Sequence, residues 1–239
     1  MDPETALYMI PVAISDGNYK DYFPEINFEI IKTLRHFIVE NVRSARRFLK
    51  KIDPAIEISE LTFHELNNHT PEHEISSYLD SLRKGEAMGL MSEAGCPGVA
   101  DPGASVARIA QSEGLRVIPL IGPSSILLSL MASGLNGQRF SFNGYLPVKD
   151  FERDKTIKHL EHQSRQNDMT QIFIETPYRN DKMMESLVKN LNGETLLCVA
   201  ANVSHPQEEK IITRKIKDWK TQEFKLEKVP TIFLFYAMK

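Results

Sequence analysis

Apolar runs and helix-like segments alternate along the first half of the chain. The helix-like segments carry apolar residues three or four positions apart, as Ile26, Ile30 and Leu34 do. Repeated strand–helix–strand units predict an α/β domain with a mostly parallel sheet. The expected strands are residues 6–14, 37–40, 56–63 and 87–92. The expected helices are residues 25–37, 42–52, 71–83 and a segment N-capped by Asp101 that ends at Gly114.

The second half changes character after residue 191, where the helical segments stop. Helices are expected at residues 123–132, 150–166 and 177–191, with strands at 140–146 and 170–175. Three further strands, at 196–203, 210–216 and 231–236, follow without helices between them, which indicates a mixed sheet. The sequence therefore predicts two α/β domains, residues 1–119 and 123–239, divided at the "PLIGP" turn.

One uncharged run, residues 117–138, is long enough to span a bilayer. Pro119, Gly122 and Pro123 interrupt it, so a buried strand, a turn and a helix are the better interpretation, and no membrane segment is expected. The formal net charge of −3 excludes a globally basic nucleic-acid binder but leaves room for a local basic patch. Two cysteines form no disulfide framework, and the N-terminus shows no signal-peptide pattern, which favours a cytoplasmic protein.

The stretch "MSEAGCPGVADPGASVARIA", residues 91–110, places a loop rich in glycine and proline between a strand and a helix. Gly98 and Gly103 have the spacing of a P-loop, but the lysine and hydroxyl residue that should follow are absent. Glu93 disfavours a bare phosphate and suits a ribose diol or a cationic ligand. A nucleoside with a positive centre, such as S-adenosylmethionine, fits both observations, and a purely structural turn is the alternative.

This loop and the segment after it carry a resemblance. Residues 92–135, "SEAGCPGVADPGASVARIAQSEGLRVIPLIGPSSILLSLMASGL", resemble the tetrapyrrole methylase family of class III S-adenosylmethionine methyltransferases, and most closely its ribosomal small-subunit cytidine-2′-O-methyltransferase branch. "FSFNGYLPVK", "FIETPYR", "VENVRSARRFL" and "FHELN" resemble other motifs of that branch in the right order. The resemblance implies a cofactor cleft between two domains, ribosomal RNA or the small ribosomal subunit as partner, and a homodimer.

The chain departs from the branch at three places. In the first strand Pro11 and Val12 match, but Ala13 stands where a glycine is usual. Glu93 replaces an aspartate, and Asn202 in "AANVS" stands where a charged residue is expected. These changes leave open a weakened cofactor site or a different target.

The resemblance also implies site residues. No metal is expected among the cofactors, because the seven histidines complete no metal-site signature. The implied cofactor-binding residues are Pro11, Glu93, Gly95, Cys96, Ser125, Ile126, Ile174, Ala201 and Thr231. A hydroxyl acceptor must lose a proton during transfer, and Glu40, Lys149 and Glu175 in the matched motifs are the candidates to take it.

A basic helix face is visible without any resemblance. Arg43, Arg46 and Arg47 continue into Lys50 and Lys51 along one side of the helix expected at residues 42–52. Such a face can follow RNA phosphates, so the three arginines are candidate RNA-binding residues, and a solvated surface is the alternative.

The main hypothesis is an S-adenosylmethionine-dependent methyltransferase that modifies a ribosomal RNA nucleotide on its 2′-hydroxyl. A methyltransferase of tetrapyrrole or corrin-type small molecules is the second hypothesis. The third is a cofactor-binding or RNA-binding protein that has lost catalysis.

Overall fold

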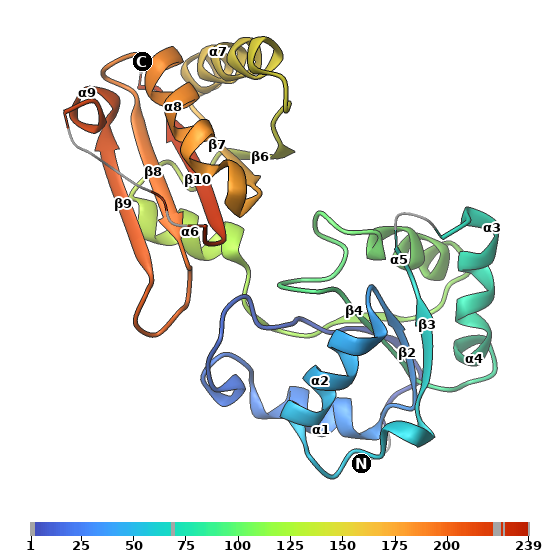
Figure 1. Ribbon diagram of the computed structural model, residues 1–239. Coiled ribbons are helices and arrows are strands. Elements are labelled where there is room, and N and C mark those ends of the chain that lie inside the picture. Colours follow the sequence, from blue (N-terminus) through green and yellow to red (C-terminus); the bar gives the residue numbers. More distant parts are fainter. Residues whose placement is uncertain (1–2, 68–69, 222–225, 227, 239) are drawn as a thin grey trace. The chain divides into compact units, whose positions relative to one another are not determined.

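The chain folds into two compact units, Met1–Ser124 and Ser125–Lys239, in a computed structural model that describes residues 3–67, 70–221, 226 and 228–238 (Figure 1). Each unit is built on its own five-stranded sheet. The first sheet is parallel throughout and the second is mixed, so the expected pair of α/β domains is confirmed.

The sheet of the first unit has the strand order β3-β2-β4-β1-β5. Strands buried on both faces read as continuous apolar runs, and β4 is buried at all four positions. The strands are β1 (Leu7–Met9), β2 (His36–Val39), β3 (Thr62–Glu65), β4 (Met88–Met91) and β5 (Val117–Pro119). The helices are α1 (Glu25–Thr33), α2 (Val42–Ile52), α3 (Glu72–Ile75), α4 (Asp80–Arg83) and α5 (Gly103–Ser112), with short 3₁₀ turns η1 (Tyr19–Asp21), η2 (Ile58–Glu60) and η3 (Ser76–Leu79).

Helices cover both faces of this sheet (Figure 1). On one face α1 and α2 bury Phe28, Phe48 and Leu49 against the strands. On the other face the segment from α3 through η3 to α4 buries residues such as Leu79, and α5 buries Val106. Both faces are therefore covered, and functional side chains are expected at the strand ends and the loops that follow them.

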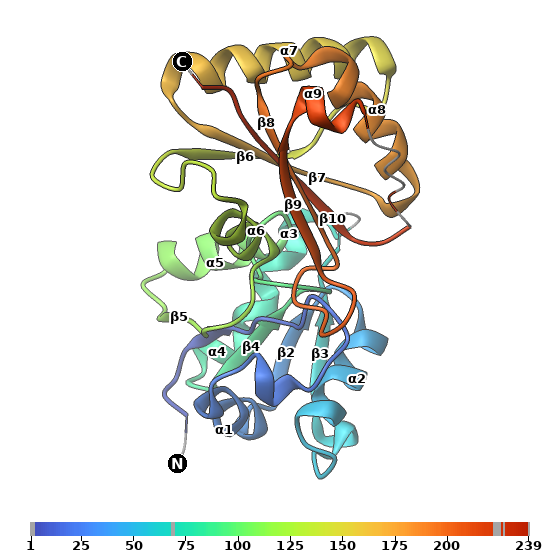
Figure 2. The ribbon, with the colours of Figure 1, turned by 90° about the vertical axis from the view of Figure 1, so that its left-hand side faces the viewer.

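The mixed sheet of the second unit has the order β6-β7-β10-β8-β9, with β6 and β7 parallel and the other pairs antiparallel. Figure 2 shows α7, α8 and α9 gathered on one side of it, away from α6. Phe173 and Phe233 face the first group, while α6 packs against β8, β9 and β10. The strands are β6 (Phe140–Tyr145), β7 (Thr170–Glu175), β8 (Leu196–Ala201), β9 (Lys210–Lys215) and β10 (Thr231–Tyr236). The helices are α6 (Ser125–Ser133), α7 (Asp150–Asn167), α8 (Asn180–Asn190) and α9 (Ile216–Trp219), with η4 (Pro177–Arg179) before α8.

The uncharged run at residues 117–138 forms β5, a turn and α6, as expected. Among the helices that the structure describes, none combines the length and the apolar character that a bilayer crossing needs.

Several element limits differ from the sequence prediction. The strand expected at residues 6–14 pairs only over β1, because the chain then turns into a loop that meets Gly95. The strand expected at 56–63 begins as the turn η2, and the helix expected at 71–83 tightens into η3 midway. Asp101 was expected to be the N-cap of α5, but the helix begins at Gly103 and its N-cap is Pro102. The Asp101 carboxylate still accepts a hydrogen bond from the Gly103 N–H at the start of the helix.

Candidate functional site

The candidate site in the first unit lies where parallel strands end. The chain leaves β1 at Ile10 and Pro11, leaves β2 at Glu40, and leaves β4 at Ser92 and Glu93. Because the carboxyl ends of parallel strands share one edge of the sheet, these residues collect on the same side. Ligands of open α/β sheets bind at this edge.

The loop after β1 is joined to the glycine-rich loop by a pair of backbone hydrogen bonds. The Val12 N–H donates to the Gly95 carbonyl at 2.8 Å, and the Gly95 N–H donates to the Val12 carbonyl at 2.9 Å. The segment after β5 closes against both loops. The Cys96 thiol donates to the Pro123 carbonyl at 3.5 Å, and a Cβ on Gly122 would lie 2.3 Å from the Pro11 Cβ. Three loops therefore converge at Pro11, Gly95 and Cys96.

A single carboxylate shapes the rest of the glycine-rich loop. Asp101 Oδ1 accepts hydrogen bonds from the N–H groups of Gly98 at 2.8 Å and Gly103 at 2.7 Å. Gly98 has a φ of 83°, where a side chain would be strained, and a Cβ on Gly103 would lie 2.8 Å from both Asp101 Oδ1 and Leu90 Cδ2. These glycines are needed by the loop itself, whatever the loop binds.

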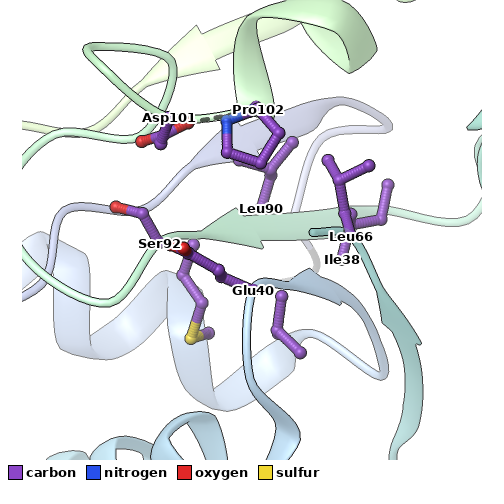
Figure 3. A pocket seen from close by; sticks show the side chains of 10 residues that line it. Ile38, Glu40, Leu66, Leu90, Ser92, Asp101 and Pro102 are labelled. Carbon is purple, nitrogen blue, oxygen red and sulfur yellow. Dashed lines mark hydrogen bonds between the residues drawn. The ribbon is translucent and has the colours of Figure 1, made fainter. Parts of the chain in front are cut away.

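A small pocket opens between this loop and the ends of β2, β3 and β4 (Figure 3). Figure 3 shows Asp101 and Ser92 at one end and Leu66 and Ile38 at the other. The lining residues are Ile38, Val39, Glu40, Leu66, Leu90, Met91, Ser92, Asp101, Pro102 and Gly103. The pocket thus has one polar end, next to Glu93, and one apolar end.

Glu40 is a carboxylate whose pKa is raised by its surroundings in the site. Its Oε2 accepts a hydrogen bond from the Glu93 N–H at 3.4 Å. Partial burial, aided by the negative charges of Glu93 and Asp101, raises the pKa of Glu40 above its ordinary value of 4.5 despite that hydrogen bond. Three carboxylates at one sheet edge disfavour a phosphate and favour a cation or a hydroxyl donor. Within the described part of the chain, no cluster of acidic, histidine or cysteine side chains could hold a metal ion.

The thiol of Cys96 is half-buried. Burial, with a smaller contribution from Asp101, raises its pKa, so the thiol stays protonated at neutral pH. Cys96 therefore suits a wall of the site better than a nucleophile.

In the second unit three of the five sequence-predicted cofactor residues meet at one edge of the mixed sheet. Thr231 begins β10 and is paired with Glu175 at the end of β7 and with Ala201 at the end of β8, and Ile174 precedes Glu175. The Thr231 hydroxyl accepts from Asn180 Nδ2 at 3.0 Å and donates to the Val229 carbonyl at 3.0 Å. Its side chain is thus used within the fold. Ser125 and Ile126 are the first two residues of α6 and are half-buried.

The two other candidate proton acceptors have different surroundings. Glu175 is buried, and its Oε1 accepts from Arg179 Nη2 at 2.5 Å and from the Thr176 N–H at 2.7 Å. Lys149 is exposed, and its Nζ lies 3.5 Å from Glu152 Oε1. Glu40 has no cationic partner among the described residues, which makes it the best placed of the three to take a proton.

The basic face of α2 is exposed as predicted. Arg43, Arg46 and Arg47 are all exposed, and the buried side of the helix is formed by Ala45, Phe48, Leu49 and Ile52. The Arg46 guanidinium lies 5.5 Å from the centre of the Phe63 ring, and Arg47 donates to the Ser44 hydroxyl at 3.3 Å. None of the three pairs with a carboxylate that the structure describes, so their charges are available to an anion.

Two contributors were not predicted from the sequence. Asp101 lies within the glycine-rich stretch, but its two hydrogen bonds, from the N–H groups of Gly98 and Gly103, depend on the folded path of the loop. Leu66 lines the pocket from the end of β3, and only the strand order reveals its position.

Comparison with known proteins identifies the relatives. No family model matches the chain. It is 33% identical over 193 residues to ribosomal RNA small subunit methyltransferase I of Xylella fastidiosa, which covers 81% of this chain and 67% of that protein. The same enzyme of Vibrio cholerae is 30% identical over 198 residues, covering 83% and 65%. That of Bacillus subtilis is 30% identical over 206 residues, covering 85% and 65%. The chain thus spans about two thirds of the length of the curated relatives it matches.

Solved structures share the fold over nearly the whole chain. The methyltransferase CobJ superposes with a TM-score of 0.63 at 17% identity, covering 97% of this chain and 94% of that one. The cobalamin biosynthetic enzyme cobalt precorrin-4 methyltransferase, CbiF, does so with a TM-score of 0.58 at 15% identity, covering 97% and 95%. Sequence identity of 30–33% to these curated relatives shows the family, and the solved structures show the same fold: the chain belongs to the ribosomal RNA small subunit methyltransferase I family.

Proposed function

We propose that this chain transfers a methyl group from S-adenosylmethionine to a 2′-hydroxyl of ribosomal RNA in the small ribosomal subunit. The observation that supports it best is the carboxylate-lined loop at the edge of the parallel sheet, in a chain 33% identical to a ribosomal RNA methyltransferase. The loop carries no phosphate-binding motif and no metal cluster among its described residues.

The residues present fit this cofactor. S-adenosylmethionine supplies a methyl group on a positively charged sulfur. The exposed carboxylate of Glu93 can accept hydrogen bonds from its hydroxyls, and Gly95 and Cys96 lie at the converging loops beside Pro11. From the second unit we propose Ser125, Ile126, Ile174, Ala201 and Thr231 as further contacts, the last three because one sheet edge gathers them.

The protein's own contribution is alignment and removal of a proton. In-line displacement requires the hydroxyl oxygen to be held behind the methyl carbon, which rigid loops favour. Glu40 would accept the proton that the hydroxyl loses when the bound cofactor supplies its methyl group and leaves as a neutral thioether. A carboxylate with a raised pKa is a stronger base than an ordinary one, which suits Glu40 to this role. Lys149 and Glu175 remain secondary candidates.

Asn202 has a structural reason to depart from the family pattern. Its φ is 49°, in the left-handed region that asparagine tolerates better than most side chains. Its N–H donates to the Pro230 carbonyl at 3.0 Å, and its Nδ2 donates to Glu208 Oε2 at 3.2 Å. The substitution therefore fits the turn after β8 and does not by itself favour lost catalysis.

We also propose that the protein acts in the cytoplasm as a homodimer. The family resemblance suggests the dimer, and the two cysteines, which form no disulfide framework, favour the cytoplasm. Leu127 and Met131, exposed one turn apart on α6, would suit a contact between copies. Equilibrium sedimentation tests the dimer.

Two measurements test the main proposal. Calorimetric titration with S-adenosylmethionine should show binding, and labelled methyl groups should appear in the RNA of small ribosomal subunits. Binding without transfer to any RNA would favour the hypothesis of lost catalysis, and transfer to a tetrapyrrole would favour the small-molecule hypothesis.

A further inference from the structure

Four large apolar side chains are exposed where β6 and β7 end. The two strands are parallel, with Tyr145 paired to Ile174, so the loops after them leave the sheet at the same edge. The exposed fractions are 58% for Tyr145, 63% for Val148, 81% for Phe151 and 81% for Tyr178. We call these four residues the aromatic edge. Solvent-exposed aromatic rings gathered at one site usually mark a binding surface.

The loop between β6 and α7, which carries Val148 and leads to Phe151, is held by side-chain contacts. Arg153, 4% exposed, donates to the Val148 carbonyl at 2.9 Å, to Asp150 Oδ1 at 2.8 Å and to the Ser186 hydroxyl at 2.9 Å. Lys182 Nζ lies 2.8 Å from the same Asp150 oxygen, which ties the start of α7 to α8. The backbone that carries Val148 and Phe151 is therefore fixed, which lowers the entropy lost when a ligand binds there.

Cations accompany the rings. Lys228 Nζ lies 5.4 Å from the centre of the Tyr178 ring, and Lys149 directly follows Val148 with its side chain 81% exposed. The second unit as a whole has 17 lysines and arginines against 14 aspartates and glutamates, whereas the first has 12 against 18. A polyanion is thus better matched to the second unit than to the first.

We propose that the aromatic edge binds an unpaired segment of RNA, with bases stacking on Tyr178 and Phe151 and phosphates lying near Lys149 and Lys228. Exposed aromatic faces interleaved with cations are how proteins hold single strands, because every base offers a flat face and every linkage a negative charge. The inference rests on the proposed function, since it places part of the ribosomal RNA substrate. A protein partner would use the same apolar area without needing flat rings or cations.

The test measures affinity of the full chain, without cofactor, for a labelled single-stranded RNA of 12 nucleotides, about the length that such surfaces cover. The double substitution of Tyr178→Leu and Phe151→Leu keeps apolar area but removes the flat rings. It should weaken binding about 10- to 100-fold, as expected for lost stacking, while Tyr178→Phe should bind like the parent. Phe140→Leu is the matched control, because it removes an exposed ring from the opposite end of β6. The corresponding duplex should bind more weakly than the single strand.

Salt titration separates the two kinds of contact. Lys228→Gln should reduce the slope of log affinity against log salt by about 0.7, and the leucine substitutions should leave the slope unchanged. Unchanged RNA affinity in the double leucine variant would overturn the inference. An RNA affinity that falls only when alanine replaces the leucines would also overturn it, and would favour a protein partner.

Methyl transfer distinguishes this inference from the proposed function. If the chain methylates no ribosomal RNA but single-strand binding still depends on Tyr178 and Phe151, the inference stands and the proposed function fails. If transfer occurs with the same KM for small subunits in parent and double leucine variant, the inference fails and the proposed function stands.

Discussion

Gly122 is a residue whose lack of a side chain the structure requires. A Cβ there would lie 2.3 Å from the Pro11 Cβ, far inside van der Waals contact. We predict that Gly122→Ala forces the loop after β1 away, costs about 1–3 kcal/mol of unfolding free energy, and weakens cofactor binding. Urea unfolding and calorimetry measure both effects. Gly137→Ala is the control, since its Cβ would meet nothing within 4 Å. Equal stability of the two variants would contradict the close approach.

Glu40 links the chemistry of the site to pH. The pKa of Glu40 is raised in the folded state above its ordinary value of 4.5, so protonation of Glu40 favours folding. This contribution to stability is fully present below pH 4.5 and is lost as the pH rises through the folded-state pKa. Glu40→Gln, which is neutral at every pH, should therefore melt slightly higher than the parent at pH 7 and equally at pH 4. Methyl transfer by this variant should fall about 10²- to 10⁴-fold, because the proton acceptor is gone.

Cofactor affinity is the control for Glu40→Gln. The glutamine oxygen can still accept the hydrogen bond from the Glu93 N–H, so calorimetry should give a dissociation constant close to that of the parent. Normal transfer with normal binding would remove Glu40 from the chemistry and return attention to Lys149 and Glu175.

The sequence predicts elements well where local signals suffice. The helix α2 was expected at its observed limits, because its apolar residues repeat with helical spacing. Predictions were less accurate for elements that tertiary contacts fix. The strand β1 is short because Val12, in the segment after it, pairs with the distant Gly95 rather than with a neighbouring strand. The four-residue helix α9 is too short to show a period and was missed.

The candidate site, like the fold, could be predicted from the sequence only where local signals suffice. The importance of the glycine-rich loop could be read from its composition, and so could the exposure of the arginines on α2. Two contacts could not be predicted: the pairing of Glu175 with Arg179 and the hydrogen bond from Asn180 to the Thr231 hydroxyl. Both depend on how η4, α8 and β10 pack.

The start of α2 offers a prediction at the scale of one element. Asn41 Oδ1 accepts a hydrogen bond from the Ser44 N–H at 3.1 Å, which satisfies a free donor of the first turn. We predict that Asn41→Ala costs about 1 kcal/mol of unfolding free energy and that Asn41→Asp costs less, since aspartate caps equally well. Urea unfolding measures both. An alanine variant as stable as the parent would show that tertiary packing alone holds the helix.

At the scale of the whole molecule, charge is divided unequally. The first unit carries a formal charge of −6 and the second +3, which together give the −3 of the chain. A polyanionic substrate is therefore repelled by the first unit except at local cationic surfaces, of which the face of α2 is one. Association with RNA should accordingly weaken as the salt concentration rises, with a shallow slope that reflects a small number of phosphate contacts.

Contact between the basic face of α2 and RNA can be tested by substitution. If Arg43, Arg46 and Arg47 meet phosphates, replacing all three with glutamine should weaken RNA binding and reduce the slope of log affinity against log salt by about 0.7–0.9 for each lost contact. Thermal stability should hardly change, because none of the three pairs with a carboxylate in the part of the chain described. Cofactor affinity should be unaffected, since the arginines are not among the residues lining the pocket beside the glycine-rich loop. An unchanged salt slope would leave α2 a solvated face and shift RNA recognition to the cationic second unit.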